Sequence, residues 1–233
     1  AQNFDIALGD SEYNRYELEQ MGYPNTGVLP LLIDYSIYTS WNHDLCNTYS
    51  DDWVNILFVG RISPNKKHED IIKVFYYYKK IKPKSRLFLP GGYGGCEPYF
   101  HSLQTLVQDL QLSDVHFPGK VPIEDLVSYY QVSDIFLCMS EHEGFNVPLV
   151  ESMYFGVPII AYNACAIPHT LGDAGILVKS KSYIEIAELI NLIVEDQAIR
   201  ERLISRQRER LKAFDYSKIA AEFYAIIKRF ELE

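Results

Sequence analysis

From Val54 onward, short apolar runs alternate with amphipathic segments, and this alternation limits the possible folds more than any other feature of the sequence. Each run is almost continuously hydrophobic, as expected for strands of a parallel sheet that is buried on both faces. The alternation predicts an α/β domain with a doubly wound parallel sheet and right-handed connections. The predicted strands are Val54–Val59, Arg86–Leu89, Val115–Phe117, Ile135–Met139, Val157–Ala161 and Ile176–Val178.

The segments around these runs divide the chain into three parts. Apolar residues recur at helical spacing in Lys67–Lys82, Pro98–Leu112 and Ile123–Tyr130, and the tail from Tyr183 is typical of consecutive helices. Residues 1–35 form a separate unit that is predicted to contain a strand, a helix and an extended run. Tyr35–Asp52 is polar and shows no periodicity, which indicates a linker or loop. We therefore expect a small unit at 1–35, a linker at 36–53 and a main domain at 54–233.

Charge and cysteine usage exclude several classes of function. The net charge is −9, from 22 Lys and Arg against 31 Asp and Glu. Sequence-independent binding of nucleic acid needs a basic face, so this balance argues against a nucleic-acid partner. The four cysteines are widely spaced, which favours reduced structural thiols over a zinc or redox site. No apolar run approaches the roughly 18 residues of a membrane span, and we expect a cytoplasmic protein.

Two acids follow the predicted strand at Ile135–Met139. In sheets of this type ligands bind beyond the carboxyl ends of the strands, so the segment after Ile135–Met139 is a first candidate site. Glu143 and Glu151 lie there, with Gly144 available for a tight turn and Pro148 placed to begin a helix. The free N–H groups of a helix start can hold a phosphate, and the two carboxylates could accept hydrogen bonds from sugar hydroxyls. Taken alone, the acids also fit a solvated loop and a helix start.

A cationic loop follows the first strand of the main domain. Gly60 permits close approach of the backbone, and Arg61 and Lys66 come before the next predicted helix. Arg61 can bind a diphosphate with two parallel hydrogen bonds, while Lys66 adds a point charge. Lys67 is interpreted as a solvated neighbour. A cation-bearing loop and an acid-bearing helix start at two strand ends together favour a functional site over two unrelated surface loops.

In this order, the two segments resemble the donor-site signatures of the retaining family 4 glycosyltransferases. The resemblance rests on Gly60 and Arg61 with Lys66, and then on Glu143, Gly144 and Phe145 with Glu151. It covers almost the whole chain, which would be the Rossmann-like C-terminal half of a GT-B glycosyltransferase. Residues 1–35 would be a remnant of the N-terminal acceptor domain, and the start at Ala1 fits a piece cut from a longer chain.

The resemblance implies specific roles at this site. Arg61 and Lys66 would bind the donor diphosphate, Glu143 the transferred sugar and Glu151 the ribose, and Arg61, Lys66 and Glu143 would be the catalytic residues. Val121, in the Pro118–Val121 loop, would lie near the base. Backbone groups would line the sugar and phosphates at Gly60 and along Gly144, Phe145, Asn146, Val147, Pro148 and Leu149.

The activity implied by the resemblance is transfer of a sugar from a nucleoside diphosphate, with retention, to a glycan or lipid-linked acceptor, as in polysaccharide biosynthesis. The catalytic histidine and acceptor groove of the family would lie upstream of Ala1, so we expect this chain alone not to transfer sugar. No Asp-x-Asp occurs, and we therefore expect neither a metal nor another cofactor. The full-length protein could also associate peripherally with the inner face of the membrane.

Two other classes of function stay open. A non-catalytic nucleotide-sugar-binding module would carry the same residues. A dinucleotide-binding oxidoreductase domain would need G-x-G-x-x-G after its first strand, and Gly91–Gly95 has neither that spacing nor that place. Pro90 and His169 depart from the family pattern, which often has Val and Glu there. His142, beside Glu143, either shapes the pocket or contacts the ligand.

Overall fold

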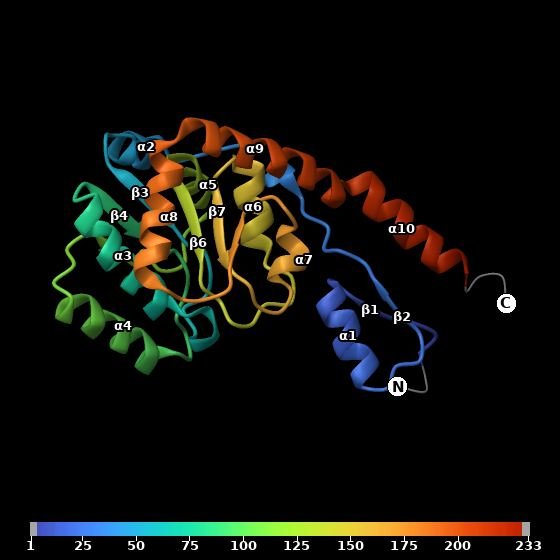
Figure 1. Cartoon of the computed structure of the whole chain (residues 1–233). Helices are drawn as coiled ribbons and strands as arrows, with labels where there is room; N and C mark the ends of the chain where they lie inside the picture. Colours follow the sequence, from blue (N-terminus) through green and yellow to red (C-terminus); the bar gives the residue numbers. More distant parts are fainter. Residues whose placement is uncertain (1–3, 230–233) are drawn as a thin grey trace.

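A computed structural model describes residues 4–229 and shows a six-stranded parallel sheet with helices on both faces (Figure 1). The strand order is β5-β4-β3-β6-β7-β8, and every neighbouring pair is parallel. The six strands that the apolar runs predict are therefore confirmed. Their bounds are β3 Val54–Leu57, β4 Ser85–Phe88, β5 Val115–His116, β6 Ile135–Cys138, β7 Ile159–Tyr162 and β8 Ile176–Val178.

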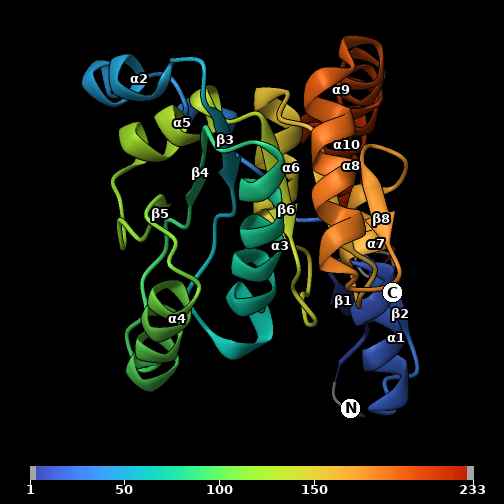
Figure 2. The ribbon, with the colours of Figure 1, turned by 60° about the vertical axis from the view of Figure 1, so that its left-hand side comes forward.

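The order of the strands determines on which face of the sheet each helix of the main domain lies. From β3 the chain proceeds to one edge of the sheet and then returns to build the other half, so right-handed connections place helices on opposite faces. Helix α8 packs against α3 on one face, and α5 contacts α6 on the other (Figure 2). The helices are α3 His68–Ile81, α4 Glu97–Asp109, α5 Ile123–Val132, α6 Val147–Phe155, α7 Ile167–Leu171, α8 Tyr183–Glu195, α9 Gln197–Leu211 and α10 Tyr216–Lys228.

The reversal of strand order positions the candidate site. Strands β3 and β6 are direct neighbours, yet the connections that follow them lead to opposite halves of the sheet. A crevice between such diverging connections is the usual ligand site of an open α/β sheet. The loop that begins at Gly60 and the segment that begins at Ser140 are therefore placed side by side.

The first unit packs on this same edge of the sheet. It consists of β1 (Ala7–Gly9) and β2 (Thr26–Val28), which pair in parallel, and α1 (Glu12–Gln20). The Ser11 hydroxyl caps α1 and also donates a 2.8 Å hydrogen bond to the carbonyl oxygen of Gly144 in the main domain. The strand and helix expected in residues 1–35 are present, and the unit contacts the predicted donor loop directly.

The stretch predicted as a linker or loop contains more structure than expected. It forms a 3₁₀ turn at Tyr35–Ile37 and a helix, α2, at His43–Tyr49 that packs on α5. The Asn42 side chain accepts hydrogen bonds from the backbone N–H groups of Asp44 and Leu45, which satisfies the helix start. A helix of seven residues is too short to repeat an apolar stripe, so periodicity could not reveal it.

Candidate functional site

The two loops predicted to form a site are held together by main-chain and side-chain contacts. The N–H of Glu141 donates to the carbonyl oxygen of Asn65 at 2.9 Å, and the Asn65 amide donates to the carbonyl oxygen of His142 at 3.2 Å. Lys66 Nζ lies 2.5 Å from Glu143 Oε2. The structure thus brings together a cation and an acid that are 77 residues apart in the sequence.

The Lys66–Glu143 pair is largely shielded from water. The Glu143 side chain is only 7% exposed and the Lys66 side chain 21%, so the Coulomb attraction between them is screened less than in a surface ion pair of the same length. A buried carboxylate without this lysine would keep an uncompensated charge. An anion that enters here would compete with Glu143 for the ammonium group of Lys66.

Arg61 is placed differently. Its side chain is exposed, its Nη2 donates to the carbonyl oxygen of Gly94 at 2.8 Å, and it forms no ion pair with any residue between 4 and 229. The backbone segments at Gly60 and Gly91 lie very close together, since a Cβ at Gly91 would lie 1.9 Å from the carbonyl oxygen of Gly60. Glycine at position 91 is therefore required for the loops after β3 and β4 to approach each other.

A concavity of about 210 Å³ opens beside Arg61. Val121, which the family resemblance places near the base, is part of its wall. The lining is mostly aliphatic, with two cationic side chains at the edge, and this suits a flat, partly apolar ring with a phosphate attached. The lining residues are Val59, Gly60, Arg61, Pro90, Gly91, Lys120, Val121 and Leu126.

The segment from Gly144 to Leu149 forms the predicted helix start, with one correction to the amide groups it offers. Asn146 adopts the left-handed conformation, with φ of 71°, immediately before α6. The N–H groups of residues 144–147 have no acceptor among the described residues and can bind an anion. Pro148 has no N–H, and that of Leu149 already donates to the carbonyl oxygen of Asn146. These two residues cannot donate main-chain hydrogen bonds to a ligand.

Glu151 lies in α6 and is held by two tyrosines that the sequence analysis did not identify. Tyr38 donates to Oε1 at 2.6 Å and Tyr130 donates to Oε2 at 2.7 Å. Burial raises the pKa of both phenols above its ordinary value, so both remain hydrogen-bond donors. Tyr38 is 113 residues away in the sequence and in the stretch interpreted as a linker, so no local signal indicated this contact.

The first unit adds further residues next to the candidate site, at Gly144 and His142. Besides the Ser11 bond, Asn14 Oδ1 would lie 3.3 Å from a Cβ at Gly144, so a side chain there would press against α1. The ring of Tyr13 meets that of His142 edge to face, with centroids 6.4 Å apart. His169 borders a cavity of about 150 Å³ between the two units, and its carbonyl oxygen accepts a bond from Arg210.

No group of three or more His, Cys, Asp or Glu side chains within residues 4–229 is arranged to hold a metal ion. Over the same range, no helix combines the length and apolarity required to cross a bilayer.

Comparisons with known proteins identify relatives of this chain. The family described as Glycosyl transferases group 1 matches residues 49–210. The O-antigen chain mannosyltransferase B of Escherichia coli is 26% identical over 169 residues, which are 71% of this chain and 43% of that protein. A Campylobacter jejuni enzyme named as an undecaprenol-linked-glycan α-1,4-N-acetyl-D-galactosaminyltransferase is 27% identical over 74% of this chain and 47% of its own length. The chain spans about half the length of these curated relatives.

Solved structures with the same fold also match. The Anabaena protein HepE, in complex with UDP and glucose, superimposes with a TM-score of 0.84 at 20% identity, covering 96% of this chain and 62% of HepE. Sucrose-phosphate synthase of Thermosynechococcus elongatus gives a TM-score of 0.80 at 23% identity, covering 99% of this chain and 59% of the synthase. At this level of identity the likeness establishes the fold.

Proposed function

The chain belongs to the group 1 glycosyl transferases, and on that premise we propose that it binds a nucleoside-diphosphate sugar across the loops after β3 and β6. Together with an acceptor-binding domain, it would transfer the sugar with retention to a glycan or lipid-linked acceptor. The observation that carries the proposal is the contact between Lys66 and Glu143, next to N–H groups of residues 144–147 that have no hydrogen-bond acceptor within residues 4–229. A HepE structure with UDP and glucose supports a nucleotide sugar as ligand.

The proposed role of this half of the site is electrostatic. In a front-side transfer the bond between the sugar C1 and the phosphate oxygen breaks, and the acceptor oxygen bonds to C1 on the same face. The proton of the acceptor hydroxyl passes to the leaving diphosphate. Negative charge grows on that diphosphate, and Arg61, Lys66 and the N–H groups of residues 144–147 would stabilise it.

We assign the remaining groups by the family resemblance. Glu143 would accept hydrogen bonds from the transferred sugar and Glu151 from the ribose. The base would occupy the concavity beside Val121. Binding would be independent of metal, because cationic side chains and N–H groups supply the positive charge.

Transfer requires both substrates in reacting geometry, a contribution of about 7–11 kcal/mol to the barrier. We propose that these 233 residues bind the donor but transfer sugar only when an acceptor-binding domain is supplied. Product formed by the purified chain with donor and a glycan or lipid extract would contradict this, and activity restored by adding that domain would support it.

The test of donor binding is a calorimetric titration with UDP-glucose, UDP-N-acetylglucosamine, GDP-mannose and NAD. We expect at least one nucleotide sugar to bind and NAD not to bind. Binding of NAD alone would favour a dinucleotide-dependent enzyme. Binding of a nucleotide sugar without transfer, even in the presence of the acceptor-binding domain, would favour a non-catalytic module.

A further inference from the structure

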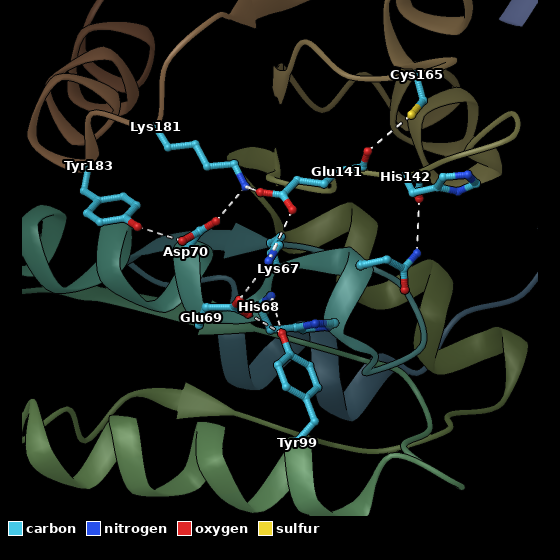
Figure 3. A network of polar contacts seen from close by, with 11 residues as sticks. Lys67, His68, Glu69, Asp70, Tyr99, Glu141, His142, Cys165, Lys181 and Tyr183 are labelled. Atoms are coloured by element: carbon cyan, nitrogen blue, oxygen red, sulfur yellow. Dashed lines mark hydrogen bonds and ion pairs between the residues drawn. The ribbon is translucent and has the colours of Figure 1, made fainter.

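An ionic network surrounds Glu141, two residues before Glu143 in the sequence (Figure 3). We call it the Lys181 network, and its members are Lys67, Asp70, Glu141, Lys181 and Tyr183. They come from the start of α3, from the segment after β6, and from the connection between β8 and α8 with the first residue of that helix. None of them was singled out as a site residue by the sequence.

Lys181 is the central member of this network. Its Nζ lies 2.7 Å from Asp70 Oδ2 and 2.7 Å from Glu141 Oε1, and it stands 4.7 Å from the centre of the Tyr162 ring. The Lys181 side chain is 15% exposed and that of Asp70 is 9% exposed. Because the Lys181 and Asp70 side chains are both shielded from water, the attraction between them is screened less than that of a surface ion pair.

Glu141 is held from several sides. Its second carboxylate oxygen, Oε2, lies 3.2 Å from Lys67 Nζ, so two lysines from different elements hold the two oxygens. Its N–H donates to Asn65, and its carbonyl oxygen accepts a 3.3 Å bond from the Cys165 thiol. Tyr183 completes the network by donating to Asp70 Oδ1 at 2.7 Å.

The position of the network connects it to the donor site. Glu141 is two residues before Glu143, and Lys67 directly follows Lys66, the partner of Glu143. His68 beside them stays neutral, because burial lowers its pKa to about 3. The contacts that hold Lys67 and Glu141 therefore also hold the two backbone segments that carry Lys66 and Glu143.

We propose that Lys181 is a positioning residue for the donor site, acting through Glu141 on the segment that presents Glu143 and the N–H groups of residues 144–147. The inference rests on the proposed function. Groups that bind a charged ligand are most effective when their supporting contacts hold them in place beforehand. Lys181 provides that support from the β8–α8 connection, outside the site itself.

The test replaces Lys181 with methionine, which keeps the length of the aliphatic stem and removes the charge. We expect the Kd for the nucleotide sugar that binds the wild type best to rise roughly tenfold, within the range seen for residues coupled in one network. Lys181→Arg should restore most of the affinity. Lys179→Met is the matched control, because Lys179 is exposed on the same connection and should bind as the wild type does.

Calorimetry separates this role from simple destabilisation. Loss of folded protein lowers the measured stoichiometry, whereas loss of positioning raises Kd at unchanged stoichiometry. Should Lys181→Met not fold, Glu141→Gln carries the same test, because the Glu141 side chain is 48% exposed and the substitution keeps its shape. Unchanged Kd in the folded variant would overturn the inference while leaving the proposed function intact. Failure of the wild type to bind any nucleotide sugar would overturn the proposed function and, with it, this inference.

Discussion

Glu143 and Glu151 are equally exposed, at 7%, but they lie in opposite environments. Glu143 is held by the charged amine of Lys66, whereas Glu151 is held by the neutral hydroxyls of Tyr38 and Tyr130. An ionised carboxylate has about four acceptor positions, so two tyrosines leave Glu151 able to accept further hydrogen bonds. The same residue type in one motif is thus prepared for two different contacts.

The two acids differ in the charge of the groups that hold them. A phosphate that approaches Lys66 competes with Glu143 for the same ammonium group, while a sugar hydroxyl can donate to Glu143 without displacing it. A hydroxyl that approaches Glu151 meets a carboxylate with no cation to displace. We infer that the Glu143 end of the motif responds to the charge of the ligand and that the Glu151 end responds to its hydroxyl groups.

The largest expected effect on nucleotide-sugar binding distinguishes Arg61 from Lys66. Among residues 4–229, Arg61 donates only to the Gly94 carbonyl, so its guanidinium group is available to a diphosphate in a way that Lys66 is not. Arg61→Ala should weaken nucleotide-sugar binding by about 1.5–3 kcal/mol, the range for hydrogen bonds to charged groups. Calorimetry measures this directly. Arg202→Ala, on the exposed side of α9, is the control and should change nothing; equal affinity in both variants would show that the diphosphate lies elsewhere.

A smaller effect tests how Glu151 is held. Tyr38→Phe removes one donor to this carboxylate and should weaken nucleotide binding by about 1 kcal/mol, the net value of one hydrogen bond. The loss should disappear with a 2′,3′-dideoxy nucleotide, which has no ribose hydroxyl to present. Tyr35→Phe is the matched control, since the buried Tyr35 hydroxyl has no hydrogen-bond partner among the described residues. An equal loss with the dideoxy nucleotide would mean that Tyr38 stabilises the fold rather than the ribose contact.

The smallest expected effect is that of metal removal. Lysine, arginine and main-chain N–H groups provide the positive charge in our account, so the Kd measured in EDTA and in excess Mg²⁺ should agree. A tenfold weaker Kd in EDTA would instead place a metal between the diphosphate and the acids.

Much of the fold could be predicted because the strands are buried on both faces. Runs such as Ile135–Met139 are apolar throughout and shorter than an ordinary helix, which favours a buried strand. The spacing of apolar residues could not predict helix α2. Asn42 followed by Asp44 is nevertheless a signal for the N-terminus of a helix. Local patterns thus identified the long elements and missed a short one that tertiary contacts support.

The candidate site was predictable only where its residues follow strands. Arg61, Lys66 and Glu143 lie at strand ends, so the topology itself brings them to one edge of the sheet. The contacts of Tyr38 with Glu151 and of Lys181 with Glu141 depend on how distant segments pack, and neither has a motif. The assignment of Glu143 to the sugar and Glu151 to the ribose stays a prediction.

The most direct test of that assignment is a titration of Glu143→Gln and Glu151→Gln with the best-binding nucleotide sugar and with the nucleoside diphosphate that it contains. Glu143→Gln should bind the diphosphate at least as tightly as the wild type, because Lys66 is released, and should lose affinity for the nucleotide sugar. Glu151→Gln should weaken both ligands equally, since both contain the ribose. Equal losses for both ligands in both variants, or no loss in Glu151→Gln, would contradict the account.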